Sequence, residues 1–331
     1  MRAAVTQRPG GPIPVVEIPD PAPGQGEALV QVKAASVNRL DRMVFDGAGL
    51  GRAAAFPLIQ GIDAAGVVVA GEGFEAGTPV VAKPAEACGV CGPCGAGRDA
   101  DCAAVSIMGI HRPGGFAELV AVPEANLVPI PPALAFGQAA AAAHVHPVVL
   151  RMLRAAEVQP GETVLVTGAA GAIGLAGVQL GVALGARVVA TCSTEEKASV
   201  VRNLGATVFT SRDGALAAEL SEIDVVVDGT GDPGVLGPAL SALAVGGRLV
   251  VVGTHGGGKL EVDLGVMYRR RQRIIGSAGS SRADFADAYR LIAEHAIEPM
   301  VSDTISLDEV EKGMEMVLDR SRVGKVVVAI G

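Results

Sequence analysis

The segment from residue 163 to residue 252 alternates between strand-like and helix-like stretches, and this alternation restricts the possible folds more than any other feature. Apolar runs such as TVLVTG (163–168), ARVVATCS (186–193) and IDVVVDGTG (223–231) are separated by stretches with helical patterning. Strand–helix–strand units build a parallel sheet, whose strands are buried on both faces and therefore read as continuous apolar runs. We predict an α/β fold with a doubly wound parallel sheet in this part of the chain.

A glycine-rich turn joins the first of these strands to the helix that follows. In VTGAAGAIG (166–174), Ala169, Gly171 and Gly174 take the three places of the dinucleotide-binding pattern G-x-G-x-x-G. The second glycine lets backbone N–H groups approach a pyrophosphate, and the third lets the helix pack closely on the strand. We predict that the turn binds a dinucleotide, with a plain tight turn as the alternative. The residues expected at the cofactor are Gly168, Ala169, Ala170, Gly171, Ala172 and Ile173.

The end of the second strand indicates which dinucleotide is bound. NAD sites usually carry an acidic residue there for the ribose 2′-hydroxyl group, whereas this chain reads Thr191–Cys192–Ser193. Glu196 is close, but together with Ser193 it has the spacing of a helix capping box. Lys197 and Arg212 are cations that can meet a 2′-phosphate, and no acid at the strand end repels one. We predict NADP(H) as the cofactor, bound at Ser193, Lys197 and Arg212, while the alternative for Lys197 is an exposed helix position.

Four of the five cysteines are concentrated in CGVCGPCGAGRDADC (88–102), with the spacing C-x2-C-x2-C-x7-C. Four thiolates complete a tetrahedral zinc shell that leaves no open position for a substrate, and they disfavour Mg²⁺ and Ca²⁺. An iron–sulfur cluster uses the same four ligands, and a loop with free thiols is a third interpretation. We predict one structural Zn²⁺ per chain, held by Cys88, Cys91, Cys94 and Cys102. Cys192 is expected to be a small core residue.

The chain before residue 125 has a different character. Short β-like runs such as ALVQVKAASV (28–37) and AAGVVVAG (64–71) are divided by glycine and proline. This pattern is typical of a β-rich, partly open barrel. One helical stretch is expected over residues 135–156, and a helix from about Ala283 to His295 precedes the closing strand GKVVVAIG.

Several stretches, in order along the chain, resemble the medium-chain dehydrogenase/reductase superfamily of zinc alcohol dehydrogenases and quinone oxidoreductases. They are VKAASVNRLD (32–41), PLIQGIDAAGVVVAG (57–71), the cysteine lobe, GGFAELVAVPEANLVPIP (114–131), PGETVLVTGAAGAIGLAGVQL (160–180) and GKVVV (324–328). The resemblance implies a GroES-like β-barrel catalytic domain over residues 1–127, with a structural-zinc lobe at 86–104, completed by residues 277–331. It also implies a Rossmann dinucleotide-binding domain over residues 128–276.

The chain departs from the zinc-dependent members where they hold a catalytic metal. Those members carry cysteine where this chain has Asn38, a histidine–glutamate pair where it has Ile62–Asp63, and a second cysteine near Ala143. Leu40 replaces their proton-relay hydroxyl group. The stretches around Asn38 and Asp63 instead resemble the zinc-free quinone oxidoreductases and enoyl reductases. This resemblance implies NADPH-dependent reduction of an activated C=C bond or a quinone, because a developing enolate needs hydrogen-bond donors and a proton but no metal.

Three side chains are candidates for polarising the substrate or supplying its proton. Asn38 can donate a hydrogen bond near the nicotinamide, or it can brace the backbone. By alignment with the family, His144 and His146 lie close to the nicotinamide, where a histidine can polarise a carbonyl or supply a proton; the alternative is two partly buried helix histidines. Met43 stands where zinc-free reductases often carry a tyrosine. Three residues after the fifth sheet strand are also expected at the cofactor: Gly253, Thr254 and His255.

Two other functions stay open at this point. One is an alcohol or carbonyl oxidoreductase that uses His144 or His146 instead of zinc. The other is a non-redox protein that binds NADPH for structure or sensing. Reduction of enones or quinones by NADPH would distinguish them from the reductase.

The charge of the chain limits its partners. The net charge is −8 over 331 residues, so no large basic surface is available for nucleic acid or an anionic membrane. The first residues lack the apolar region of a signal peptide, and no apolar run is long enough to span a membrane. We expect a cytoplasmic enzyme that acts on a small molecule and forms a homodimer or a tetramer. The sequence does not identify the substrate.

Overall fold

The computed structural model describes residues 1–210 and 221–331 and divides into two compact units. The first unit comprises residues 1–144 and 280–331, and the second comprises residues 145–279 apart from the ten undescribed positions. The first unit therefore extends beyond residue 127. The reason is that helix α3 (Phe136–Ala142) packs against strands β3 (Glu27–Val37) and β18 (Lys325–Ala329) of that unit.

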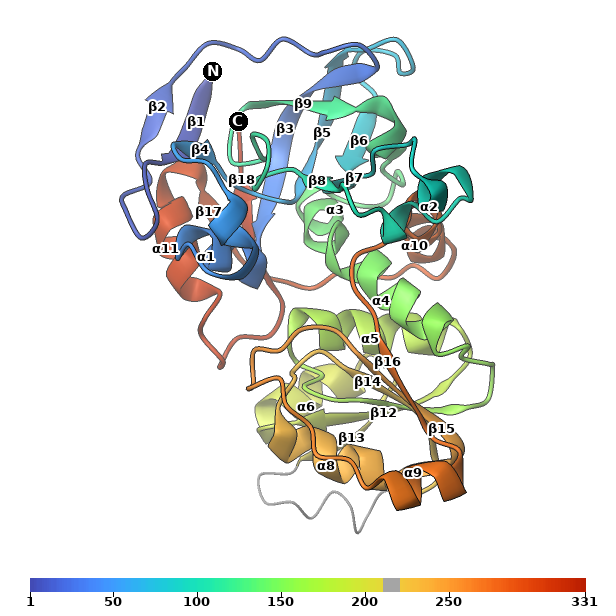
Figure 1. The fold of residues 1–331 in the computed structure, drawn as a ribbon. Helices are drawn as coiled ribbons and strands as arrows, with labels where there is room; N and C mark the ends of the chain where they lie inside the picture. Colours follow the sequence, from blue (N-terminus) through green and yellow to red (C-terminus); the bar gives the residue numbers. More distant parts are fainter. Residues whose placement is uncertain (211–220) are drawn as a thin grey trace. The chain divides into compact units, whose positions relative to one another are not determined.

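The first unit is built mainly from antiparallel strands (Figure 1). Its largest sheet has the order β10-β6-β5-β3-β18-β17, and β9 also pairs with β3. Besides β3 and β18, its strands are β1 (Arg2–Thr6), β2 (Val15–Glu17), β4 (Leu58–Ile59), β5 (Ala64–Ala70), β6 (Pro79–Ala82), β7 (Ala85–Glu86), β8 (Ser106–Ile107), β9 (Leu119–Pro123), β10 (Leu127–Pro129) and β17 (Val301–Ser306). Its helices, besides α3, are α1 (Arg39–Phe45), α2 (Gly92–Gly95), α10 (Arg282–Glu294) and α11 (Val310–Met316), with 3-10 turns at Gly49–Ala53, Asp99–Asp101, Glu124–Asn126 and Leu307–Glu309.

The alternation of side chains along β3 explains how this sheet encloses a core. Ala28, Val30 and Val32 are buried, whereas Gln31 between them is exposed. Successive residues of a strand point to opposite faces, so one face of β3 enters the core while the other meets solvent. The predicted β-rich, barrel-like architecture of this part of the chain is confirmed.

The second unit contains one parallel sheet, with the order β13-β12-β11-β14-β15-β16 among its described residues. Its strands are β11 (Thr163–Val166), β12 (Arg187–Cys192), β13 (Thr207–Thr210), β14 (Ile223–Asp228), β15 (Leu243–Val251) and β16 (Arg273–Gly276). Its helices are α4 (Val145–Ala155), α5 (Ala172–Ala183), α6 (Glu195–Arg202), α8 (Pro233–Ser241) and α9 (Leu264–Arg270).

Helices cover both faces of this sheet, as Figure 1 shows for α5 and α8. Gly177 of α5 faces Val166 and Val227, whereas α8 packs in a core with Leu165 and Val226. Because neighbouring residues of a strand point to opposite faces, the two helices lie on opposite sides. Both faces are thus buried, which accounts for the continuous apolar runs in the sequence. The predicted doubly wound parallel sheet is confirmed.

The helical stretch expected over residues 135–156 is two helices rather than one. Helix α3 ends at Ala142 and α4 begins at Val145. Pro147 has no backbone N–H to donate to the carbonyl of Ala143, so a continuous helix would lose a hydrogen bond and meet a steric clash there. In the described part of the chain, no helix is long and apolar enough to cross a membrane.

Candidate functional site

A buried polar cluster in the first unit surrounds the predicted catalytic residue Asn38. Asn38 lies between the end of β3 and the start of α1. Asp63 lies just before β5, and Lys325 is the first residue of β18. All three side chains are almost fully buried. The Lys325 ammonium donates to Asn38 Oδ1 at 2.5 Å and lies 3.4 Å from Asp63 Oδ2. These two oxygen partners compensate the buried ammonium ion for the loss of its hydrating water.

The amide group of Asn38 is committed to partners within the chain. Its Nδ2 donates to Asp63 Oδ2 at 2.7 Å and to the carbonyl oxygen of Ser36 at 3.4 Å. The Ser36 hydroxyl group also donates to Asp63 Oδ2. Both hydrogens of the Asn38 amide are therefore occupied. In this conformation the side chain braces the cluster and has no hydrogen left for a substrate oxygen.

Asp41 supports the cluster from α1. Its carboxylate accepts hydrogen bonds from the backbone N–H groups of Asn38, at 2.7 Å, and Ile62, at 3.1 Å. Burial first, and then the charge of Asp63, raises the pKa of Asp41 to about 7. This carboxylate fixes the turn that carries Asn38 against the segment that carries Asp63. Asp41 and Lys325 lie in the family-like stretches VKAASVNRLD and GKVVV, but sequence reasoning gave neither of them a role, because nothing in either stretch links the two positions.

His144 follows α3 and is half-buried in the same unit. Burial lowers its pKa; the carboxylate of Asp63 acts in the opposite direction, and the charge of Lys325 lowers the pKa further. The imidazole is therefore neutral at pH 7. Tyr289 of α10 is buried beside α3, and its hydroxyl group donates to the carbonyl of Ala139 at 2.7 Å. Asn38 and His144 therefore lie near the same two charged side chains, those of Asp63 and Lys325.

His146 belongs to the second unit, where it lies on α4 and is buried. Its Nε2 lies 3.1 Å from Oε1 of Gln179 on α5. Because α4 packs against α5, this contact has the character of an interhelical hydrogen bond within that unit. The two predicted histidines therefore have different described contacts: His144 lies near the Asp63–Lys325 charges, and His146 contacts Gln179.

The four cysteines of the lobe come together as a zinc site requires. Their sulfur atoms all lie within 4.8 Å of one another, and the Cys91–Cys94 and Cys91–Cys102 pairs are 3.4 Å and 3.9 Å apart. Zinc–sulfur bonds of about 2.3 Å place the corners of a tetrahedron about 3.8 Å apart. Backbone N–H groups of Val90 and Cys91 lower the pKa of Cys88 to about 6, which favours the thiolate that binds a metal. The four ligands fit a structural zinc.

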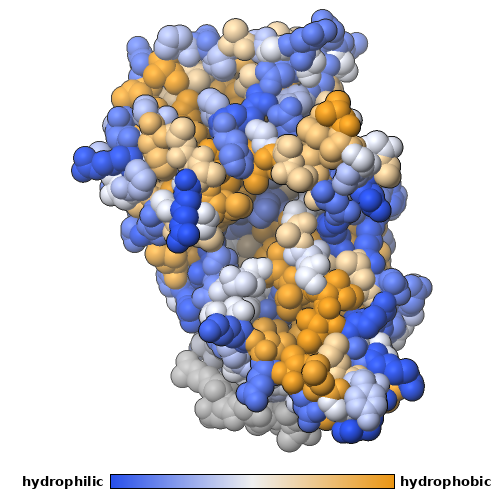
Figure 2. All heavy atoms as spheres, in the orientation of Figure 1, coloured by the Kyte–Doolittle hydropathy of each residue, from blue (hydrophilic) through white to orange (hydrophobic). Residues whose placement is uncertain are grey.

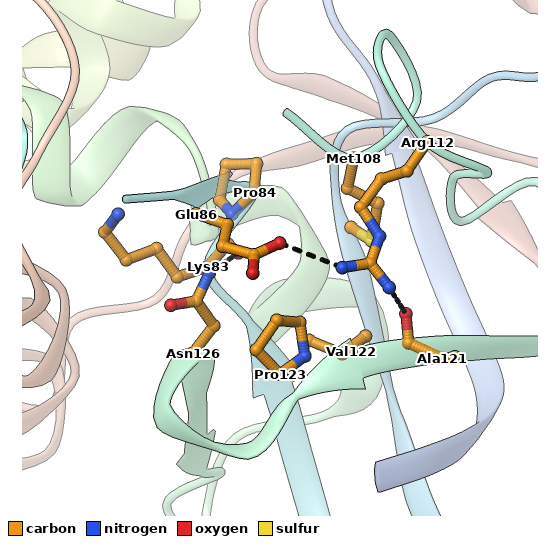
Figure 3. Close-up of a pocket in the computed structure, with 9 residues that line it drawn as sticks. All are labelled: Lys83, Pro84, Glu86, Met108, Arg112, Ala121, Val122, Pro123 and Asn126. Carbon is orange, nitrogen blue, oxygen red and sulfur yellow. Dashed lines mark hydrogen bonds and ion pairs between the residues drawn. The ribbon is translucent and has the colours of Figure 1, made fainter. Parts of the chain in front are cut away.

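This is the only such group among the described residues, since no other set of three or more histidine, cysteine or acidic side chains there is close enough to share an ion. A small cavity of the first unit lies between Lys83, Glu86, Arg112 and Asn126 (Figure 3). Its volume is about 10 Å³, which is room for one water molecule at most. Arg112 closes it with hydrogen bonds to Glu86 and to the carbonyl of Ala121, both at 2.9 Å. This cavity is too small for a substrate.

The glycine turn of the second unit has the geometry of a phosphate cradle. It lies between β11 and α5, with Gly168 at a φ of 57° and Gly171 as the N-cap of α5. A Cβ atom on Gly174 would lie 2.4 Å from the Gly168 carbonyl oxygen, so glycine is needed there for packing. A Cβ atom on Gly171 would meet only that oxygen, at 3.4 Å. The fold itself does not require glycine at 171, whereas the approach of a pyrophosphate would.

A hollow of about 420 Å³ adjoins the ends of β12 and β13, and it is lined by Ser193, Thr194, Glu195, Glu196 and Thr210. The Lys197 ammonium donates to Ser193 Oγ at 3.1 Å. The expected Ser193–Glu196 capping box is wrong: Thr194 is the N-cap of α6, and its hydroxyl group accepts from the Lys197 N–H. The helix begins one residue later because Thr194, in an extended conformation, accepts the capping hydrogen bond. Arg212 lies outside the described residues.

The loops after β14 and β15 are joined at the same end of the sheet. The Asp228 carboxylate accepts from the N–H groups of Thr230, at 3.1 Å, and Gly231, at 2.8 Å. Gly256 N–H donates to the Thr230 carbonyl, so the loop that holds Gly253, Thr254 and His255 is fixed beside the loop after β14. Ligands of parallel sheets bind at the carboxyl ends of the strands. The three predicted cofactor residues lie at that end.

These features define an oxidoreductase architecture: a β-rich unit with a cysteine metal site and a parallel-sheet unit with a dinucleotide turn. Two family models match the chain, "Alcohol dehydrogenase GroES-like domain" at residues 24–132 and "Zinc-binding dehydrogenase" at residues 172–294. An acryloyl-coenzyme A reductase from Metallosphaera sedula is 33% identical over 99% of both chains. The chain belongs to the medium-chain dehydrogenase/reductase superfamily of zinc-type alcohol dehydrogenases, and it is an oxidoreductase of that type.

Solved structures agree with this assignment. A structure described as an NAD-dependent alcohol dehydrogenase is 32% identical, covers 100% of both chains and superposes with a TM-score of 0.92. A cobalt- and zinc-bound thermostable alcohol dehydrogenase from Pyrobaculum aerophilum is 34% identical, covers 100% of this chain and 99% of its own, and has a TM-score of 0.90.

Proposed function

We propose that this protein is an NADPH-dependent reductase of C=C bonds that are conjugated to a carbonyl or thioester group, and that it works without a catalytic zinc ion. The observation that carries this proposal is the composition of the cluster in the first unit. Asn38, Ile62 and Ala143 stand where zinc-dependent relatives carry their ligands, and the cation of that cluster is Lys325. Oxidising an alcohol requires removal of its hydroxyl proton, which zinc normally facilitates.

The chain's own residues would bind the cofactor and supply the proton. Gly168 to Ile173 and the N-terminus of α5 fit the pyrophosphate, and the loop at Gly253 to His255 fits the nicotinamide end. When bound, the nicotinamide would supply the hydride that adds to the β-carbon of the substrate. The electron pair of the C=C bond then moves toward the carbonyl oxygen, and the α-carbon needs a proton. His144 is our candidate for polarising that oxygen or relaying the proton.

A thioester of coenzyme A is our first choice of substrate class. The supporting observation is the name of the Metallosphaera sedula relative, an acryloyl-coenzyme A reductase, which aligns over nearly its whole length. A thioester carbonyl withdraws electrons from an adjacent C=C bond, so hydride addition to the β-carbon needs no metal activation. Free enones and quinones are further candidates with the same electronic requirement.

NADPH is proposed over NADH on the chemistry near β12. No acidic residue ends that strand, and the Lys197 ammonium is held at Ser193, where a 2′-phosphate would sit. Glu195 and Glu196 also line this hollow, and Glu195 is paired with Arg202. Glutamate near the 2′ position favours NADH, so the ratio of the two affinities is the relevant measurement.

An alcohol or carbonyl oxidoreductase is the second candidate. The names of the two solved relatives, both alcohol dehydrogenases, favour it. In this case His144 or His146 would act in place of zinc. A non-redox protein that binds NADPH for structure or sensing is the third candidate, and any turnover of NADPH excludes it.

The deciding experiment is a set of NADPH-oxidation assays with the purified, zinc-loaded protein. Acryloyl-CoA, a cyclic enone and a benzoquinone are compared with acetaldehyde and acetone, and alcohol oxidation is followed with NADP⁺ and NAD⁺. We expect turnover with an activated alkene and none with the simple alcohols. Efficient oxidation of a primary or secondary alcohol, without alkene reduction, would establish the second candidate instead.

A homodimer joined through the edge of the parallel sheet is also proposed. Strand β16 pairs only with β15 among the described residues. Val245 of β15, Leu264 and Tyr268 of α9, and Ile274 of β16 are exposed. Figure 2 shows hydrophobic residues gathered on one face of the second unit. An exposed apolar patch beside a strand whose outer edge is unpaired favours pairing with another chain. Light scattering of wild type and Ile274→Lys distinguishes a dimer from a tetramer or a monomer.

We also propose that the protein is located in the cytoplasm.

A further inference from the structure

The cation in the buried cluster of the first unit comes from the chain itself. Lys325 is 6% exposed, Asn38 is 5% exposed, and Asp63 and Asp41 are fully buried. Burying an ammonium ion is costly unless the surrounding groups compensate it. Here an amide oxygen and a carboxylate oxygen do so, at 2.5 Å and 3.4 Å. The chain therefore maintains a buried positive charge 287 positions away from Asn38.

The partners of Asn38 leave only one orientation of its amide group. Two acceptors, the Asp63 carboxylate and the Ser36 carbonyl, lie on the nitrogen side, while the Lys325 donor lies on the oxygen side. A flipped amide would direct its N–H groups at an ammonium ion and its oxygen at a carboxylate. Lys325 is thus what distinguishes the two ends of the Asn38 side chain, and Asn38 in turn holds Asp63 Oδ2.

We propose that Lys325 is a positioning residue for the reductase reaction, whose buried ammonium orients Asn38 and Asp63 and takes the electrostatic place of a metal ion in the catalytic domain. The inference rests on the proposed function. Zinc-dependent relatives place a cation-binding cysteine at position 38, and this chain places an amide oxygen that binds an internal cation there.

The titratable groups of and around the Lys325–Asp63 pair come from four elements. Asp41 lies on α1, Asp63 before β5, His144 after α3 and Tyr289 on α10. Burial lowers the pKa of Lys325, and the two carboxylates oppose this effect. In turn the ammonium lowers the pKa of His144, while Asp63 raises it. Removing the positive charge leaves Asp63 unopposed, so we expect the imidazole of His144 to gain a proton more easily.

The test compares three substitutions in the full-length protein. Lys325→Met removes the charge at similar volume, Lys325→Gln also keeps a hydrogen-bond donor, and Lys325→Arg keeps the charge. Lys83→Met is the matched control, because Lys83 is the other nearly fully buried lysine among the described residues and lies 3.9 Å from Asp99. Figure 3 shows its place beside the small cavity.

Two readouts are followed: the pKa of His144 from the NMR titration of its ring protons, and the pH profile of kcat with the activated alkene. For Lys325→Met and Lys325→Gln we expect a higher His144 pKa and a loss of about tenfold or more in kcat. We expect Lys325→Arg to restore much of both, and Lys83→Met to alter neither. An unchanged His144 pKa and kcat in Lys325→Gln would overturn the proposal, as would equal loss in Lys325→Arg and Lys325→Gln.

The NMR titration needs no substrate, so it separates this proposal from the proposed function. If no activated alkene is turned over but the His144 pKa rises in Lys325→Gln, the electrostatic role stands and the reaction assignment fails. If Lys325→Met does not fold, Lys325→Gln and the wild-type titration suffice: a wild-type His144 that titrates above its ordinary value of about 6.5 would contradict the role of the ammonium.

Discussion

The Sγ atoms of Cys91 and Cys102 lie 3.9 Å apart, although ten residues separate them in the lobe. This distance matches the edge of a tetrahedron of zinc-bound sulfur atoms, about 3.8 Å. The lobe is therefore folded in the geometry that a zinc ion requires, with the thiolate of Cys88 already favoured by backbone N–H groups. Four such ligands would leave no position for a substrate on the ion, so we expect the lobe to bear on stability and not on the reaction.

Metal analysis of the purified protein should give about one zinc per chain, because only one complete ligand set exists among the described residues. Cys94→Ser should lose most of the zinc and unfold at lower temperature, while any protein that stays folded keeps the same reaction. Cys192→Ser, at a buried cysteine of the second unit, is the control for zinc content. Two zinc ions per chain, or iron with visible absorbance, would contradict this assignment.

Two glycines of the same turn should respond differently to alanine. Gly174→Ala places a methyl group 2.4 Å from the Gly168 carbonyl oxygen, so we expect a loss of about 1–3 kcal/mol in the free energy of unfolding. Gly171→Ala meets no such contact, so its stability should stay within about 1 kcal/mol of wild type while NADPH binding weakens. Urea unfolding and fluorescence titration measure the two effects. Equal binding of NADPH by wild type and Gly171→Ala would mean that the turn does not hold the pyrophosphate.

Lys197→Ala should weaken NADPH binding more than NADH binding. Losing one charge-assisted contact to the 2′-phosphate costs about 1.5–3 kcal/mol, or roughly ten- to a hundredfold in Kd. Lys312→Ala, at an exposed lysine of the first unit, serves as the control. Calorimetric titration of both cofactors gives the ratio. If the wild-type protein binds NADH as tightly as NADPH, the NADPH assignment is wrong.

His144 should act in its neutral form. Its pKa is lowered by burial, so the proton is lost below the ordinary value of about 6.5, and kcat should stay level between about pH 7 and 8. His144→Ala should reduce kcat by about 10²–10³, as expected for the loss of one donor that stabilises a developing oxyanion. His146→Ala, at the Gln179 contact in the second unit, is the comparison. If kcat instead falls steadily above pH 6, His144 donates as an imidazolium; if both variants keep full turnover, the proton comes from solvent.

The local features of this protein could be predicted from the sequence alone. The strand–helix alternation, the glycine turn and the cysteine spacing each depend on residues within one or two elements. Their physical requirements, such as the close packing of Gly174 on Gly168, therefore appear as short patterns. The capping residue of α6 was misplaced by one position, because Ser193 and Thr194 both offer a hydroxyl group and only the backbone conformation selects between them.

The state of Asn38 was decided only by the tertiary structure. From the sequence it was equally a donor for the substrate or a bracing residue, and its amide proves to be held by Asp63 and Lys325. Lys325 comes from the last strand and follows no period or motif that links it to position 38. β18 pairs with β3, and this pairing brings Lys325 close to Asn38. Polar groups that are buried need hydrogen-bond partners, so the two side chains bind each other. The sequence determined which elements form, while long-range strand pairing and the cost of burying charge determined which side chains meet.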